Sequence, residues 1–234
     1  MESIIKVTIE AVIFGGLGLF FGFGGSWFFN KMPAKWLCDY DEEPDGKLLL
    51  ENQRIKTYPW KFVIAAFLMI AGVRFALIDA YFAGGALILS TALVFIAVAD
   101  YKYSIIPDQL VLFALLSAIG FVKSNGGIVN MLIGAGIAVG ILLLIAVSGK
   151  LIFKKWPMGG GDFKLYAALG LALGPYGFLI VFAISTILSA LAFAYKMAKG
   201  KSKLGDELPL GPYIFVGTEI YLCLLYSYSF NLML

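Results

Sequence analysis

The sequence contains no histidine and only two cysteines among its 234 residues. Histidine is the usual general base near neutral pH, the partner of serine and cysteine nucleophiles and a common zinc ligand. Its absence excludes those mechanisms. Cys38 falls in a predicted loop and Cys223 in a predicted apolar helix, so they indicate neither a disulfide framework nor a thiolate metal site. We interpret both cysteines as structural, and any chemistry must depend mainly on carboxylates or lysines.

Charged residues are scarce as well, at 14% of the chain, whereas 61% of the residues are hydrophobic. Ordinary globular chains carry roughly 25% charged residues. Apolar runs of about 20 residues are typical of membrane-spanning helices, and this chain has several of them. The composition therefore predicts an all-α, polytopic membrane protein with the lipid bilayer as its surroundings. The net charge of +3 gives no indication of nucleic acid as a partner.

The apolar runs predict about eight transmembrane helices. Their expected ranges are 4–29, 60–82, 84–99, 108–122, 128–147, 162–174, 175–195 and 209–230. Residues 30–59 form the one sizeable polar segment, and its acidic run from Asp39 to Asp45 is typical of a solvated loop. We expect a first helix with a larger loop at 1–59, followed by a helical bundle at 60–234.

Lysines in the short loops indicate the orientation, because positive residues concentrate on the cytoplasmic side of a membrane. Placing the 30–59 loop in the cytoplasm puts most loop lysines on that side: Lys102, Lys150, Lys154, Lys155, Lys196, Lys199, Lys201 and Lys203. The opposite loops hold only Lys123, with Lys6 at the amino end of the chain. The pattern predicts a multi-pass protein of the cytoplasmic (inner) membrane with both chain ends outside.

Two aspartates stand at the cytoplasmic ends of predicted helices. Asp162 follows three glycines, Gly159 to Gly161, and Asp100 ends the predicted 84–99 helix. Glycine is poorly suited to regular helix, so irregular and open backbone is expected before Asp162. Irregular backbone at membrane depth occurs only where protein or a water-filled cavity surrounds it. The alternative is that each aspartate merely caps its helix.

Two carboxyl groups that share one proton can hydrolyse an amide bond, since one activates a water molecule while the other protonates the leaving nitrogen. The spacing of Asp100 and Asp162 in the sequence does not show whether they meet. Asp108 suits the first turn of the predicted 108–122 helix, where its charge favours the helix dipole. Lys164 is compatible with holding a substrate or an aspartate, and equally with reaching the lipid headgroups.

The segment GGGDFKLYAALGLALG resembles the GxGD segment of the type IV prepilin peptidases, with Gly159, Gly161, Asp162 and Lys164 on its motif positions. The segment ADYKYSIIPDQL is similar to the other aspartate segment of that family. It places Asp100 at the first catalytic position, and Ile106, Pro107 and Asp108 at the motif that follows. Residues 22–33 and 208–217 resemble the ends of the first and last helices of the family. The four segments occur in the order that the family has.

The resemblance implies a membrane aspartyl endopeptidase with Asp100 and Asp162 as catalytic residues. Its substrates would be prepilins or pseudopilins, whose basic leader is removed just before their hydrophobic helix at the cytoplasmic face. Bacterial members commonly also methylate the new amino terminus with S-adenosylmethionine. Many members carry two CxxC pairs in the first cytoplasmic loop, whereas this loop has only Cys38, so we expect no metal. Matches at Gly25, Ser26 and Asn30 leave methylation open.

Two other functions compete with this one. A presenilin-like intramembrane protease also carries GxGD and cuts within helices, but the Ile-Pro-Asp sequel to Asp100 favours the prepilin peptidases. A transporter would use charges inside the membrane, for which Arg74, Asp79 and Glu219 are candidates. We expect Arg74 to pair with Glu219, because both lie at a similar depth and each would be costly alone.

Overall fold

The computed structural model describes residues 2–38, 43–44, 53–154, 158–201, 203 and 208–226. Within these residues all of the regular secondary structure is helical, as predicted, and no strand occurs among them. The acidic run predicted to be a solvated loop lies outside the described residues except for Glu43. Lys155, one of the lysines used for the orientation, lies outside them too.

Seven α-helices form the structure. In order they are α1 (Glu2–Lys31), α3 (Phe62–Ala76), α4 (Ala80–Tyr103), α5 (Asp108–Leu116), α6 (Ile128–Phe153), α7 (Gly160–Ala198) and α8 (Gly211–Ile220), counted over the described part of the chain. Short turns of 3₁₀ or π type stand at Ala34–Leu37, Thr57–Lys61, Ser117–Phe121 and Tyr221–Leu225. Five of the helical stretches are long and apolar enough to cross a membrane, which confirms a polytopic membrane protein. The two shorter apolar stretches are 108–121 and 211–225.

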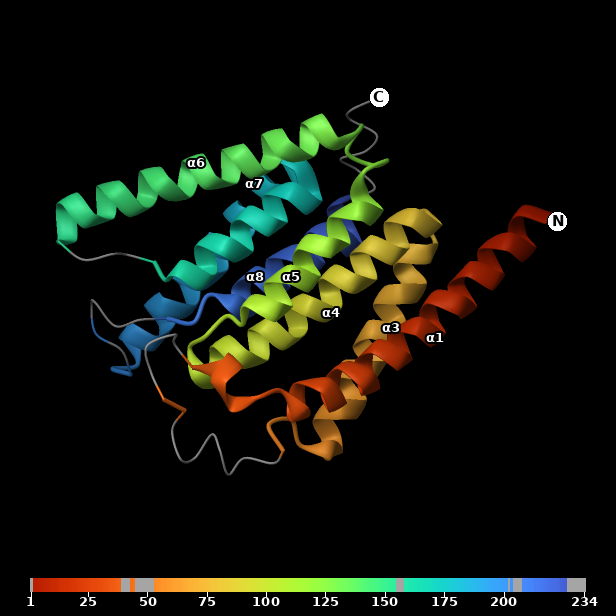
Figure 1. Cartoon of the computed structure of the whole chain (residues 1–234), viewed down its shortest axis with the longest axis horizontal. Coiled ribbons are helices and arrows are strands. Elements are labelled where there is room, and N and C mark those ends of the chain that lie inside the picture. Colours follow the sequence, from red (N-terminus) through yellow and green to blue (C-terminus); the bar gives the residue numbers. More distant parts are fainter. Residues whose placement is uncertain are drawn as a thin grey trace.

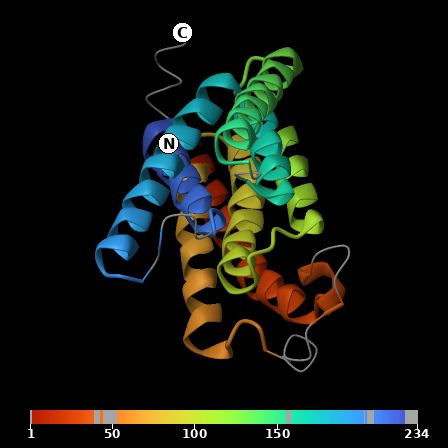
Figure 2. The same ribbon diagram turned by 90° about the vertical axis from the view of Figure 1, so that its left-hand side faces the viewer.

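Helix α4 lies at the centre of the bundle and packs against α1, α3, α5 and α8 (Figures 1 and 2). In the most apolar stretch of this helix 78% of the residues are buried, a far larger share than in the other helices of the described chain that are long enough to span a membrane. Asp100 is in the last turns of this central helix. One aspartate of the predicted pair is therefore carried by the element with the most packing around it.

The longest helix, α7, folds back on itself at Gly174, whose φ of 68° and ψ of −176° are not helical. Tyr166 and Ser185 are 19 residues apart, yet their hydroxyl oxygens are 2.9 Å apart. A straight helix would separate them by about 28 Å at 1.5 Å per residue. The predicted break at Gly174 and Pro175 is thus present, and α7 supplies two helical segments that run in opposite directions.

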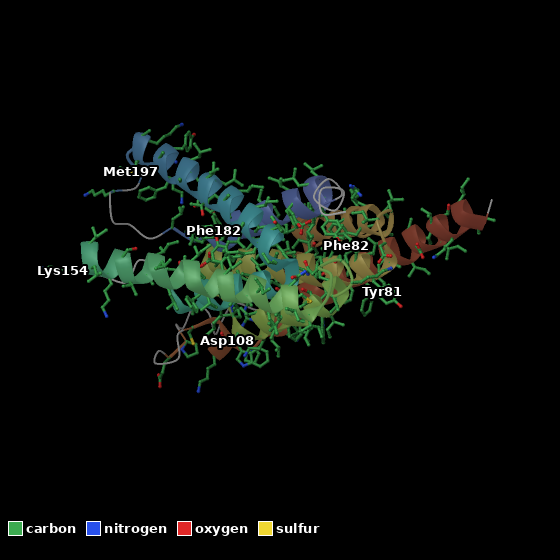
Figure 3. All side chains as sticks on the ribbon, turned by 90° about the horizontal axis from the view of Figure 1, so that it is seen from above. Tyr81, Phe82, Asp108, Lys154, Phe182 and Met197 are labelled. Atoms are coloured by element: carbon green, nitrogen blue, oxygen red, sulfur yellow. The ribbon has the colours of Figure 1, made fainter. Side chains whose placement is uncertain are left out.

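The two ends of the molecule differ in the residues they carry. Figure 3 shows Lys154, at the end of α6, and Met197, near the end of α7, at one end of the molecule. Tyr81 and Phe82, at the start of α4, lie toward the other end. The C-terminal ends of α6 and α7, which lead into the lysine-rich connections, therefore lie at the same end of the molecule.

The charges proposed for the membrane interior have different surroundings from those expected. Asp79 caps the start of α4, where its Oδ1 accepts hydrogen bonds from the backbone N–H groups of Tyr81 and Phe82 at 2.9 and 3.2 Å. Its Oδ2 lies 3.9 Å from Lys123 Nζ. Asp79 is therefore a helix cap beside a loop lysine rather than a partner for Arg74, because a short polar side chain satisfies the free N–H groups of a first turn.

Glu219 does not form the expected ion pair with Arg74 in the described structure; Arg74 acts electrostatically on Cys223, one turn after Glu219. Glu219 is buried, and its Oε1 has no hydrogen-bond partner. Its Oε2 lies 3.9 Å from Cys223 Sγ. The depth of a residue along a helix does not determine the direction of its side chain.

The fold-back at Gly174 gives a test of stability. In the Gly174→Ala variant, the new Cβ would lie 2.6 Å from Asn125 Oδ1 and the backbone would keep a positive φ. Such a conformation costs a non-glycine residue about 1 to 3 kcal/mol. We expect the thermal unfolding midpoint in detergent to fall by several degrees. Gly136→Ala on α6 is the matched control, because no atom lies within 4 Å of the added methyl, and its midpoint should not fall.

Candidate active site

Asp100 is held at the C-terminal end of α4 by a backbone donor from a distant part of the chain. The N–H of Gly211, the first residue of α8, donates a hydrogen bond of 2.6 Å to Asp100 Oδ2. Asp100 is 6% exposed. A Cβ on Gly211 would lie 2.9 Å from the Asp100 Cβ, so only glycine lets this backbone approach the carboxyl so closely. The orientation of Asp100 is therefore fixed by α8.

The chain leaves α4 through a tight turn. Ser104 takes a left-handed conformation with φ of 54°, and its N–H donates to the carbonyl of Asp100 at 2.9 Å. Pro107 is extended, and α5 begins directly after it at Asp108. Proline fixes its own φ and lacks an N–H, which suits the position before a helix. The polar segment predicted after Asp100 thus forms one wall of the site.

Asp162 lies in the first turn of α7, next to the three glycines. Gly159 is extended and precedes the helix, and a Cβ on it would lie 3.6 Å from Asp162 Oδ2. A Cβ on Gly161 would lie 2.9 Å from the Ile106 Cβ, while one on Gly160 would contact nothing within 4 Å. Gly161 therefore permits close packing of the start of α7 against the segment that follows Asp100.

The two aspartate segments enclose one cavity of about 720 Å³. Asp100 and Asp162 both line it, and the two carboxyl groups are close enough to act on each other electrostatically. The other lining residues are Lys35, Trp36, Cys38, Ser104, Ile105, Ile106, Pro107, Asp108, Gln109, Gly159, Gly160, Gly161 and Lys164. The cavity lining thus includes every residue that the resemblance placed on the two aspartate motifs: Asp100, Ile106, Pro107, Asp108, Gly159, Gly161, Asp162 and Lys164.

Lys164 is directed toward Asp108, with its Nζ 2.9 Å from Oδ1 and 3.0 Å from Oδ2. Both side chains are partly exposed, and they join the first turn of α7 to the first residue of α5. The sequence left open whether Lys164 holds a substrate, holds an aspartate or reaches the headgroups. In the structure it contacts an aspartate, which is Asp108 and not one of the two proposed catalytic residues. Because a partly exposed pair is worth little to stability, its importance is that it stands at the edge of the cavity.

Several residues of the site were not found from the sequence. Gly211 belongs to a segment that resembled the family, but nothing in the sequence indicated a hydrogen bond to Asp100 across 111 positions. Lys35, Trp36 and Cys38 enter the cavity wall from the chain that follows α1. Cys38 was interpreted as structural, yet it lines the same cavity as the aspartates. Contacts between such distant segments leave no local pattern in one sequence.

Gly25, Ser26 and Asn30, which left methylation open, make contacts within the protein. Ser26 is fully buried, and its hydroxyl donates to the Gly22 carbonyl at 2.7 Å. A Cβ on Gly25 would run into the ring of Phe95. The Asn30 side-chain N–H donates to the Ile55 carbonyl at 3.1 Å, and the Asn30 side-chain oxygen accepts from the Ile55 N–H at 2.7 Å. These contacts hold α1 in place.

Curated relatives share one name. A protein called prepilin leader peptidase/N-methyltransferase from Xanthomonas campestris pv. campestris is 34% identical over 165 residues, covering 68% of this chain and 56% of that protein. Its namesake from Bacillus subtilis is 29% identical over 160 residues, covering 68% and 62%. The namesake from Pseudomonas aeruginosa is 32% identical over 145 residues, covering 60% and 49%. This chain therefore spans about half to three-fifths of the length of these relatives, and no solved structure matches it significantly.

The family described as the type IV leader peptidase family matches residues 87–194. The matched segment includes Asp100 and Asp162, the glycines before Asp162 and the Lys164–Asp108 pair, whereas Gly211 lies beyond it. The segment is thus the one that forms most of the cavity. Residues 87–194 of this chain are therefore similar to the type IV leader peptidase family, and they include both aspartates that line the cavity.

Proposed function

We propose that this protein is a membrane aspartyl endopeptidase that removes the basic leader from prepilin-like substrates. The observation that carries the proposal is that Asp100 and Asp162 line one cavity at two helix ends. The relatives are named prepilin leader peptidases, and the family match covers both aspartates. The same match favours this function over a transporter or a presenilin-like protease.

In the proposed reaction the two carboxyl groups hold one proton between them, because two ionised carboxylates close together repel each other. The N–H of Gly211 donates to Asp100, and a hydrogen bond to the charged form favours that form. We therefore assign the base to Asp100 and the proton donor to Asp162. Asp100 takes a proton from water as the water oxygen attacks the scissile carbonyl carbon. Asp162 then protonates the leaving nitrogen as the carbon–nitrogen bond breaks.

The substrate we infer is a prepilin or pseudopilin with a basic leader and a hydrophobic helix. The cavity carries three carboxyl groups, from Asp100, Asp108 and Asp162, beside two lysines, Lys35 and Lys164. With one proton shared by Asp100 and Asp162 these charges balance, so the inference of a prepilin-like substrate rests on the names of the relatives rather than on attraction by charge. The leader should then lie across the cavity with the cleaved bond at the two aspartates. The proposal covers cleavage alone, because Gly25, Ser26 and Asn30 are taken up by contacts within the protein.

We further propose that the cavity faces the cytoplasm from the inner membrane. The lysine distribution supports this orientation. The lysine-rich connections after α6 and α7 stand at the ends of those helices where Lys154 and Met197 lie together (Figure 3). A basic leader that remains on the cytoplasmic side would meet the cavity without crossing the membrane.

The pair of aspartates is tested by removing one proton site at a time. Asp100→Asn and Asp162→Asn keep the size of each side chain, so both variants should insert and fold, but each should lose leader cleavage by about 10³-fold or more. Because the two residues act as a unit, the double variant should be hardly worse than either single one. The measurement is cleavage of a purified prepilin by matched amounts of enzyme, read by mass spectrometry.

Asp79→Asn is the control for these variants, because asparagine also caps a helix and Asp79 lies outside the cavity. It should retain activity. Full cleavage by Asp162→Asn would contradict the aspartyl mechanism. An inactive Asp108→Asn beside an active Asp100→Asn would show that the first catalytic aspartate is Asp108.

The glycines before Asp162 give a second test of the geometry. Gly161→Ala adds a methyl group that meets Ile106, so the start of α7 must shift away from the segment that follows Asp100. Since a displacement of about 1 Å can cost on the order of 100-fold in rate, we expect kcat/KM to fall by about 10 to 100-fold. Gly160→Ala meets nothing within 4 Å and should stay within about twofold of wild type. Equal activity of the two variants would remove the role given to Gly161.

The orientation is tested by labelling single cysteines in intact cells, after Cys38 and Cys223 have been replaced by serine. A cysteine at Lys123 should react with a membrane-impermeant thiol reagent. One at Lys201 should react only after the membrane is opened. Both positions are exposed in the structure, so protection reports the side of the membrane. The reverse labelling would show that the cavity faces outward.

A further inference from the structure

An apolar groove adjoins the cavity and has no part in the proposed chemistry. It has a volume of about 470 Å³ and lies between α5, α6 and α7. Leu112 and Leu115 form the α5 side, Ala167 and Leu171 the α7 side, and Ala135 the α6 side. Leu112 is 55% exposed and Leu115 is 40% exposed, so the groove opens outward rather than into the core.

Both α5 and α6 pack against α7, and the short connection after Phe121 joins α5 to α6 along the chain. Near that connection α6 crosses α7 closely, since a Cβ on Gly170 would lie 2.6 Å from the carbonyl oxygen of Gly134. The groove is thus closed at one end and lined partly by alanines. Small residues let another helix approach closely within a membrane, where packing rather than hydrophobicity drives association.

At its other end the groove continues into the cavity. Asp108 and Lys164, joined by their ion pair, line both spaces. On one side of this pair the lining contains the carboxyl groups of Asp100 and Asp162, and on the other side it is almost entirely apolar. The surface therefore changes from polar and charged to apolar along one continuous path.

We propose that this groove, defined by Leu112, Leu115, Ala135, Ala167 and Leu171, holds the first turns of the substrate's hydrophobic helix during cleavage. The inference rests on the proposed function, because the inferred substrate changes from a polar leader to an apolar helix at the cleaved bond, in the same order as the surface changes from polar to apolar. Along α7 the groove runs from Lys164 to Leu171, about 10 Å or two turns. Two turns of helix packed there would fix the distance from the apolar helix to the two aspartates.

The first experiment compares alanine-to-leucine changes. Ala135→Leu and Ala167→Leu fill the groove from two sides, and Ala146→Leu makes the same change farther along α6, outside the groove. The probe is a synthetic peptide with a lysine-rich leader followed by an apolar helix of about 20 residues. Both groove variants should raise KM about tenfold with kcat nearly unchanged, the pattern expected when ground-state and transition-state binding are lost together. Ala146→Leu should have the KM and kcat of the wild type. The comparison is made with variants whose thermal unfolding midpoints equal that of the wild type.

The second experiment locates the bound helix directly and does not depend on turnover. A photo-crosslinking benzoylphenylalanine is placed at Leu112 or at Leu144, which is 72% exposed on α6 and lies outside the groove. In the Asp162→Asn background the same peptide remains uncleaved. Position 112 should crosslink to the first two turns of its apolar helix, whereas position 144 should not.

The outcomes separate the two proposals. If the wild-type protein does not cleave the peptide, the proposed function fails whatever the groove does. If the wild-type protein cleaves it but Ala135→Leu and Ala167→Leu leave KM unchanged, the groove is not the docking site. Crosslinks from position 112 to lipid alone, or to a second copy of this chain, would also overturn the assignment of the groove to the substrate.

Discussion

The site depends on close approach between backbone segments that are far apart in the sequence. A carboxyl group at a helix end in a membrane protein is normally free to turn toward the headgroups or water. Asp100 is prevented from doing so by the N–H of Gly211, whose lack of a side chain allows a hydrogen bond of 2.6 Å. Gly161 has the same role on the other side, where it packs against Ile106. Two glycines thus hold the two aspartate segments around one cavity.

The rest of the bundle supports this arrangement. The central helix α4 carries Asp100 and is packed on several sides, so its end is a fixed reference for the site. Because α7 folds back at Gly174, its first half is held both by its own second half and by Asn125, whose side chain donates to the Ala172 carbonyl at 2.9 Å. The position of Asp162 is therefore set by contacts made at both ends of a short helical segment.

Much of this could be predicted from the sequence, and the physical reason is that the bilayer imposes long apolar runs. Those runs predicted an all-helical protein. Gly159 to Gly161 predicted the irregular backbone before Asp162, and Gly174 with Pro175 predicted the break inside α7. The resemblance gave Asp100 and Asp162 as candidates, and both line the cavity. The Arg74–Glu219 pair was not found, because the level of a residue in a helix does not determine its direction. Gly211, Trp36 and Lys35 were missed, because their roles come from contacts that no local spacing encodes.

The shortness of α5 has a consequence for the membrane itself. Together with the 3₁₀ turn that continues it, α5 forms the apolar stretch 108–121, which spans about 21 Å at 1.5 Å per residue, and the first half of α7 is also short of the roughly 30 Å of a hydrocarbon core. A bilayer beside such short segments thins locally, and polar headgroups move inward. The boundary between water and lipid would then descend toward the cavity. A peptide bond at the junction of a polar and an apolar segment could meet water there without the apolar segment being drawn out of the membrane.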